Sequence, residues 1–265
     1  MLLAIDIGNT NITLGVCEGQ TWRRQWRLLT VQEKTADEYG LILKGLLYGA
    51  GLDTAVTHMI FSSVVPRLTA TLDAACRQYL GLVPLEVGLN LDLGIRVATD
   101  VPSQVGMDRI INATAAYHLY PGPSIIVDMG TATKFDVVTA AGELVGGVIA
   151  PGLQLTADAL ASRAAKLGQV ALEAPPQTIG RNTIHAMQSG LVFGYVSLCE
   201  GLVARLRAEH PDHNRPIRIL GTGGLIHLIA EYTDIIDHVD PWLTLTGLRV
   251  IHERVKGRLG EGVTG

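Results

Sequence analysis

Two short turns carry the residue types that bind phosphate and cations. The first is Asp6–Thr10, with the sequence DIGNT, and the second is Asp128–Thr133, with the sequence DMGTAT. A carboxylate can hold Mg²⁺ directly or through water, and the N–H groups and hydroxyls of a glycine-containing turn can surround a phosphate. An ordinary hairpin turn uses the same residues. Because the pattern occurs twice, we predict a phosphate and divalent-cation site.

A third group with possible chemistry is Gly106–Arg109, at the start of a predicted helix. Asp108 could orient or deprotonate an attacking hydroxyl, and Arg109 could hold a carboxylate through two hydrogen bonds. The helix N-terminus favours the charged form of Asp108. A weak base suffices for phosphoryl transfer, where positioning matters most. The alternative is that Asp108 only complements the helix dipole and Arg109 is solvated.

Two further glycine-rich segments could approach a ligand. Gly221–Gly224 lies between a strand and a helix, where its glycines would admit a flat or phosphorylated ligand. A strand-to-helix turn without a ligand is the alternative. Gly146–Gly152 is either a loop near the substrate or a kinked strand end.

Composition and charge exclude several classes of function. The chain has 265 residues, 48% of them hydrophobic and 17% charged, which is typical of a compact globular protein. The net charge of −4 gives no electrostatic reason to expect nucleic acid or an anionic membrane as a partner. The three cysteines are isolated, which fits a reducing cytosol. The eight histidines show no metal-ligand spacing, and His210 and His213 are expected to be solvated.

The elements that must position these residues follow a pattern that occurs twice. Strands are predicted at 2–5, 12–16 and 22–29, and again at 124–128, 134–139 and 144–149, after the break at Tyr120–Pro123. Further strands are expected at 57–65 and 217–220, and helices at 36–50, 70–80, 103–117, 153–166, 183–207 and from about 245. Strands followed by helices in each half indicate an α/β protein with an internal duplication. We expect an N-terminal lobe, 1–118, and a C-terminal lobe, 119–265.

The motifs taken together resemble those of a known family. They occur in order along nearly the whole chain: Asp6-x-Gly-Asn-Thr, Ser63-Val64-Val65-Pro66, Gly106-x-Asp108-Arg109, Asp128-x-Gly-Thr-Ala-Thr133, Gly146-Gly147-x-Ile149-x-Pro151-Gly152-Leu153, Gly180-x-Asn182-Thr183 and Thr222-Gly223-Gly224. In this combination the chain resembles a type III pantothenate kinase.

The resemblance implies a fold and an activity. The fold would be the duplicated ribonuclease H-like (actin-like ATPase) fold, with two similar lobes around a nucleotide cleft. The activity would be ATP-dependent phosphorylation of pantothenate to 4′-phosphopantothenate, the first step of coenzyme A biosynthesis. The resemblance also implies Mg²⁺, a monovalent cation (K⁺ or NH₄⁺) and a homodimer. We expect a cytoplasmic enzyme without nucleic-acid or membrane partners.

The resemblance also assigns roles to residues. The ATP phosphates would be held by the first turn and the start of the next strand, with Mg²⁺ near Asp6. These residues are Asp6, Ile7, Gly8, Asn9, Thr10, Asn11, Ile12 and Thr13. ATP would also contact Thr131. Asp108 would be the catalytic base and Asp128 would bind the monovalent cation. Pantothenate would be bound by Thr99, Gly106, Met107, Asp108, Arg109 and Thr183.

The chain departs from the family pattern at two positions. Thr99 stands where the family usually has a tyrosine that contacts pantothenate, and Lys134 stands where the second turn normally continues with a threonine. We hypothesise that the Lys134 ammonium, if it points into the cleft, partly replaces the monovalent cation. The preferred interpretation is that Lys134 faces solvent.

Two other functions stay open at this point. One is a kinase of the same fold that acts on another small hydroxy acid or a sugar. The other is a weakly active relative retained as a nucleotide-binding regulatory protein. Asp6, Asp108 and Asp128 are all present, which favours an active kinase.

Overall fold

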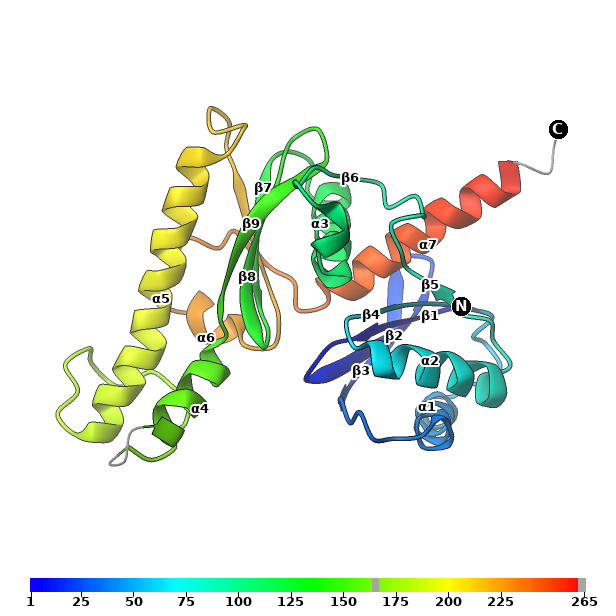
Figure 1. The fold of residues 1–265 in the computed structure, drawn as a ribbon, viewed down its shortest axis with the longest axis horizontal. Coiled ribbons are helices and arrows are strands. Elements are labelled where there is room, and N and C mark those ends of the chain that lie inside the picture. Colours follow the sequence, from blue (N-terminus) through cyan, green and yellow to red (C-terminus); the bar gives the residue numbers. More distant parts are fainter. Residues whose placement is uncertain (164–166, 262–265) are drawn as a thin grey trace. The chain divides into compact units, whose positions relative to one another are not determined.

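A computed structural model describes residues 1–163 and 167–261, with side chains described up to residue 257. The chain forms two compact units (Figure 1). Unit 1 comprises Met1–Ile95, Val101–His118 and the segment from Thr244 onward, and unit 2 comprises Arg96–Asp100 and Leu119–Leu243. The division drawn from the sequence, 1–118 and 119–265, stays a prediction. The compact units differ from it at 96–100 and from Thr244 onward.

Unit 1 is built on a five-stranded sheet with the order β3-β2-β1-β4-β5. Its strands are β1 Leu2–Ile7, β2 Asn11–Glu18, β3 Thr21–Leu29, β4 His58–Ser63 and β5 Leu85–Glu86. The first three strands form an antiparallel meander, and β4 returns parallel to β1. The central strand β1 is therefore covered on both edges, which fits its continuous apolar sequence up to Asp6.

The helices of unit 1 have recognisable starts. They are α1 Ala36–Gly49, α2 Pro66–Ala75 with the π-turn Cys76–Leu80, α3 Met107–Leu119 after the 3₁₀ turn Pro102–Gln104, and α7 Leu243–Glu261. Thr35 and Glu38 form a reciprocal capping box at the start of α1. Pro66 occupies the first turn of α2, where its missing N–H costs no helical hydrogen bond.

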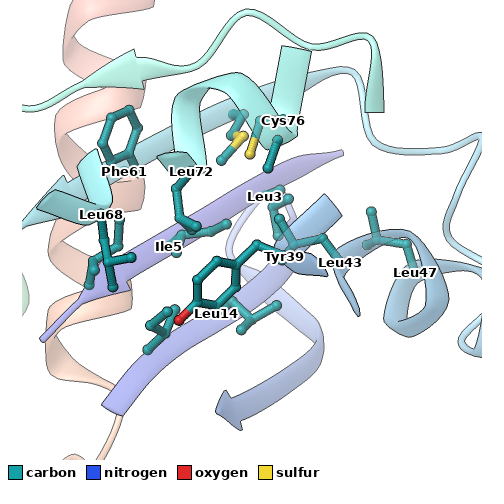
Figure 2. Close-up of a cluster of buried hydrophobic side chains, with 14 of the residues drawn as sticks. Leu3, Ile5, Leu14, Tyr39, Leu43, Leu47, Phe61, Leu68, Leu72 and Cys76 are labelled. Carbon is teal, nitrogen blue, oxygen red and sulfur yellow. The ribbon is translucent and has the colours of Figure 1, made fainter. Parts of the chain in front are cut away.

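The main core of unit 1 lies between the sheet and helices α1 and α2 (Figure 2). Alternate residues of β1 and β2 point into it, and Tyr39 and Phe61 are its largest side chains. The other residues labelled in Figure 2 are Leu3, Ile5, Leu14, Leu43, Leu47, Leu68, Leu72 and Cys76. Because strand side chains alternate between faces, Asp6 points to the opposite face of the sheet.

Unit 2 has the same strand order with one addition, β11-β10-β7-β8-β9-β6. Its strands are β6 Arg96–Val97, β7 Ser124–Met129, β8 Ala132–Val138, β9 Glu143–Pro151, β10 Arg218–Thr222 and β11 His238–Val239. The strands β7, β8 and β9 again form an antiparallel meander, and β10 is parallel to β7. The predicted internal duplication is confirmed.

Helices α4 Leu153–Arg163, α5 Thr183–Glu209 and α6 Ile226–Ala230 belong to unit 2. Its core combines alternate residues of β7 and β8 with residues of these helices, among them Leu191, Tyr195 and Cys199 of α5. Among the residues described, α5 alone is long and apolar enough to cross a membrane by length and composition. A core helix passes the same test, and this face of α5 is buried in the core.

Most predicted elements are present, with shifts at their ends. The helix predicted at 70–80 begins earlier, at Pro66, because proline fits the first helical turn. The helix predicted from 103 begins at Met107, after a 3₁₀ turn. The short strands β5, β6 and β11 were not predicted. The last residues of the helix predicted at 153–166 lie outside the described residues.

His210 was expected to be solvated, and this was wrong. Its side chain is buried, with 1% of the residue exposed, because the loop after α5 folds back onto β8. The Asp212 N–H donates to Nδ1 over 2.9 Å, and Nε2 lies 3.3 Å from the Val138 carbonyl oxygen. Burial lowers the pKa of His210 below its ordinary value. The native protein therefore favours the neutral imidazole.

This burial predicts a pH dependence of stability. As the pH falls below the ordinary histidine pKa of about 6.5, the unfolded chain takes up a proton that native His210 resists, so stability decreases. We expect His210→Gln to reduce the loss of thermal stability between neutral and mildly acidic pH. Unfolding midpoints across this range measure the slope. His118→Gln, at an exposed histidine, should leave the slope unchanged, and an unchanged slope in His210→Gln would contradict the assignment.

Candidate active site

The first predicted turn closes the β1–β2 hairpin of unit 1. Asp6 is the penultimate residue of β1, and its neighbours in the sheet are Thr13 on β2 and Ser62 on β4. The buried Ser62 hydroxyl donates a 2.6 Å hydrogen bond to Asp6 Oδ1. This bond fixes the carboxylate at the carboxyl end of the sheet, where ligands bind in open α/β folds.

The turn itself is held by backbone contacts and by Thr30. The Gly8 N–H donates to the Asn11 carbonyl over 3.0 Å, and the Thr30 hydroxyl donates to the Gly8 carbonyl over 2.7 Å. A Cβ at Gly8 would lie 2.9 Å from the Asn11 oxygen. Glycine is therefore required for the close turn, and Asn9 and Thr10 are left exposed at its tip.

Asp108 lies in the first turn of α3, also in unit 1. The Gly106 carbonyl accepts hydrogen bonds from the N–H groups of Arg109 (3.0 Å) and Ile110 (3.3 Å). A Cβ at Gly106 would lie 2.6 Å from Asp108 Oδ1, so the carboxylate folds back over the glycine. Met107, Asp108 and Arg109 are all partly exposed. The group can therefore present a carboxylate and a guanidinium together.

Helix α3 is fixed by α7, which covers the face of the sheet that carries Asp6. The Thr244 hydroxyl donates to the buried Asn112 Oδ1 over 2.7 Å. On the sheet, a Cβ at Gly15 would lie 3.0 Å from Leu245 Cδ1. Gly15 lies two residues after Thr13 on β2, and Thr13 pairs with Asp6, so all three residues lie on the same face of the sheet. Helix α7 therefore packs on the face to which Asp6 points. The structure thus brings Asp6 and the helix of Asp108 to one side of the unit 1 sheet.

The second predicted turn closes the β7–β8 hairpin of unit 2. Asp128 is the penultimate residue of β7, as Asp6 is of β1, and both strands show the same burial pattern. Two other glycine-rich segments press on this turn. A Cβ at Gly152 would lie 2.2 Å from the Thr131 carbonyl oxygen, and one at Gly223 would lie 2.5 Å from that of Met129. Both segments singled out in the sequence therefore contact the second turn.

The prediction that Lys134 faces solvent was wrong. Lys134 lies directly opposite Asp128 in the β7–β8 ladder, so the two side chains share a face of the sheet. Lys134 Nζ lies 2.8 Å from Asp128 Oδ2, and the side chains are 15% and 13% exposed, respectively. The second turn therefore contains a mostly buried ion pair that the first turn lacks at the equivalent position, Thr13.

Sequence reasoning missed two residues that support the turns. Ser62 contacts Asp6 only through the parallel register of β4, and nothing in the sequence near Ser62 signals this pairing. Tyr195 of α5 places its hydroxyl 2.6 Å from the Thr133 hydroxyl and also in contact with the Pro151 carbonyl. It therefore fastens α5 to the second turn.

The remaining predicted residues lie in unit 2. Thr99 follows β6, and its hydroxyl is a buried atom with no hydrogen-bond partner among the described residues. Thr183 is exposed at the first position of α5, where the Asn182 side chain accepts the His185 N–H over 2.8 Å. The positions of Thr99 and Thr183 relative to Asp108 remain predictions.

A pocket of about 410 Å³ in unit 2 lies away from all of these residues. It is lined by Pro123, Arg218 and His238, among others, which lie at the amino ends of the parallel strands. Asp128 and Thr222 lie at the carboxyl ends, the usual edge for ligands. The pocket is therefore not the predicted active site.

The first turn also fits a magnesium ion of the kind that kinases use. Among the described residues, no group of three or more histidine, cysteine, aspartate or glutamate side chains could form a metal cage. Mg²⁺ in nucleotide enzymes needs only one or two carboxylates, with waters and phosphate oxygens completing the shell. The carboxylate of Asp6 is a metal ligand of this type. It accepts a hydrogen bond from Ser62 and lies next to Thr13 in the sheet.

Solved structures share this fold across almost the whole chain. An activator of 2-hydroxyisocaproyl-CoA dehydratase from Clostridium difficile matches with a TM-score of 0.55 and 11% identity, covering 98% of this chain and 97% of that one. An inorganic polyphosphate/ATP-glucomannokinase from Arthrobacter sp. matches with a TM-score of 0.51 and 13% identity, covering 94% and 96%. The repeated strand order and these matches define the duplicated ribonuclease H-like fold of actin-like ATPases and sugar kinases.

Sequence relatives define the family within this fold. The family model described as type III pantothenate kinase matches residues 2–205. The type III pantothenate kinase of Moorella thermoacetica is 46% identical over 255 residues, covering 96% of this chain and 99% of the relative. That of Pelobacter propionicus is 47% identical over 256 residues, covering 96% and 99%. The chain belongs to the type III pantothenate kinase family.

The glycine packing around the second turn gives a testable prediction. Gly152→Ala would force a Cβ against the Thr131 and Gly130 carbonyl oxygens, which are backbone atoms and cannot move aside cheaply. We expect a loss of about 1–3 kcal/mol in the free energy of unfolding, as for other overpacked sites. Gly190→Ala is the control, because its Cβ would meet nothing within 4 Å. Denaturant unfolding should show a stability unchanged or raised in the control, and equal stability of the two variants would refute the packing role.

Proposed function

We propose that this protein transfers the γ-phosphoryl group of ATP to the primary hydroxyl of pantothenate, giving 4′-phosphopantothenate for coenzyme A biosynthesis. One observation carries the proposal: the family match over residues 2–205 includes both Asp-Gly turns and the Gly106–Arg109 helix start. Asp6, Asp108 and Asp128 are all present within it. A chain that had lost this activity would not be required to keep three carboxylates at strand and helix ends.

In this proposal the first turn binds the ATP phosphates. The N–H groups and side chains from Gly8 to Thr13 would supply donors around the phosphate oxygens. Asp6 would hold Mg²⁺, with its carboxylate oriented by the Ser62 hydroxyl. When bound, Mg²⁺ supplies positive charge that offsets the negative charge of the phosphates. Thr131, exposed at the tip of the second turn, contacts ATP from unit 2.

Pantothenate would be bound by the start of α3 together with Thr99 and Thr183. Arg109 pairs with its carboxylate through charge-assisted hydrogen bonds, for which a guanidinium is well shaped. The orphan hydroxyl of Thr99 is a polar group that a hydroxyl or amide of the substrate could satisfy. Because a threonine is shorter than the tyrosine usual in the family, it reaches less far toward the substrate.

Asp108 would act on the attacking hydroxyl. Its carboxylate accepts a hydrogen bond from the pantothenate hydroxyl, aligns that oxygen with the γ-phosphorus, and takes the proton as the new O–P bond forms and the bond to ADP breaks. The proton then leaves to solvent from the partly exposed carboxylate. Positioning of the hydroxyl supplies most of the rate increase when the transition state is loose.

The homodimer and the cytoplasmic location implied by the family are part of the same proposal.

The monovalent cation implied at Asp128 fits the residues poorly, however. The Lys134 ammonium already lies 2.8 Å from this carboxylate in a mostly buried setting.

An assay of ADP release with and without pantothenate tests the proposed activity. Stimulation by pantothenate supports it, whereas stimulation only by another hydroxy acid or a sugar favours the first alternative. ATP binding without turnover on any substrate favours a regulatory relative.

Asp108→Asn keeps the shape of the side chain but cannot accept the proton. We expect the pantothenate-stimulated rate to fall by about 10²–10⁴-fold, as for loss of a general base, with ATP binding retained. Asp53→Asn makes the same change at an exposed loop aspartate of unit 1 and should keep the full rate. If Asp108→Asn also keeps the full rate, Asp108 is not the base.

A further inference from the structure

We propose that Lys134 is a built-in cation for the second turn, so that this kinase works without a free monovalent cation. The inference rests on the proposed function, because it concerns how the same site is charged. It is carried by the Lys134–Asp128 ion pair in unit 2, where the family resemblance implies a dissociable K⁺ or NH₄⁺.

The internal duplication provides the comparison. In unit 1 the penultimate residue of β1 is Asp6, whose antiparallel neighbour is Thr13 and whose parallel neighbour is Ser62. In unit 2 the penultimate residue of β7 is Asp128, whose corresponding neighbours are Lys134 and Thr222. One position thus differs in charge between the two copies. In unit 1 the carboxylate faces a hydroxyl-bearing residue at this position, whereas in unit 2 it faces an ammonium that is itself a cation.

The chemistry of the two ions is matched. An alkylammonium is an ammonium ion attached to the chain, with N–H donors that carboxylate oxygens accept. At 2.8 Å from Asp128 Oδ2, Nζ is at the distance of a charge-assisted hydrogen bond. A second monovalent cation at the same oxygen would lie close to this ammonium, where like charges repel strongly in a site only 13–15% exposed.

A neighbouring strand position places a second acidic residue on the same face. Asp136 lies two residues after Lys134 on β8, so its side chain leaves the same face of the sheet, and it is fully buried. The face therefore carries two acidic side chains and one ammonium. Replacing Lys134 by a neutral residue removes the positive charge beside Asp128, and a small cation from solution is the simplest replacement.

Measurements on the wild-type chain test the proposal directly. Pantothenate-dependent ADP release is followed at a constant ionic strength of about 0.1 M, set by tetramethylammonium chloride and then by increasing KCl or NH₄Cl. We expect the wild-type rate to change by less than about twofold across the titration, because a tethered partner of a carboxylate does not dissociate. A wild-type enzyme that is inactive without K⁺ or NH₄⁺ would overturn the proposal.

Lys134→Thr restores the residue usual in the family at this position. We expect its rate in tetramethylammonium to fall by about tenfold or more, since a buried carboxylate loses its partner, and K⁺ or NH₄⁺ to restore it. Lys134→Arg keeps a charge and should stay independent of K⁺. Lys44→Thr, at an exposed position of α1, controls for loss of a surface lysine. A Lys134→Thr enzyme that is fully active and indifferent to K⁺ would also contradict the proposal.

A readout without turnover separates this inference from the proposed function. The unfolding midpoint of Lys134→Thr should rise by about 2–4 °C in KCl relative to tetramethylammonium chloride, because an ion that binds only the native state stabilises it. The wild-type midpoint should show no such difference. If pantothenate stimulates no ADP release under any salt, the proposed function fails, while these midpoints still decide whether Lys134 occupies the cation position.

Discussion

The structure depends on burying the central strand of each sheet on both edges, with one partly exposed residue at its penultimate position. In unit 1 β1 lies between β2 and β4, and in unit 2 β7 lies between β8 and β10. Such a strand must be apolar until it emerges, so a charged side chain fits only at its carboxyl end. Asp6 and Asp128 occupy that position in both copies. The hairpin and the parallel return strand then set the neighbours of each carboxylate.

Those neighbours explain how the two structural repeats can differ in function. Asp6 lies beside hydroxyl-bearing residues, and the Ser62 hydroxyl donates a hydrogen bond to it. Asp128 lies beside an ammonium, and its turn is packed by Gly152 and Gly223 and tied to α5 by Tyr195. In the proposed function, the first copy accepts a cation together with phosphate. In the second copy, the Asp128 carboxylate is already paired with the Lys134 ammonium.

Local patterns predicted much of this arrangement from the sequence. Gly8 and Gly130 mark turns that almost any alternating pair of strands would need, and apolar runs mark β1 and β7. The sequence allowed a hypothesis about Lys134 but could not decide which way its side chain points, because a shift of one residue in register would have placed it on the opposite face. The surroundings of His210 and Ser62 could not be predicted either, because they come from segments distant in the sequence. The loop after α5 brings His210 to β8, and the parallel strand β4 brings Ser62 to Asp6.

The way the chain alternates between the two units has a consequence for synthesis. Unit 1 is interrupted by 96–100 and by 119–243, and it receives α7 only after unit 2 has been made. Domains generally fold in order as they leave the ribosome, yet here the earlier unit depends on the later residues. The bond from Thr244 to Asn112, which steadies the helix of Asp108, can form only after residues 119–243 have been made. The helix that carries Asp108 therefore gains this support only after the second turn has been made.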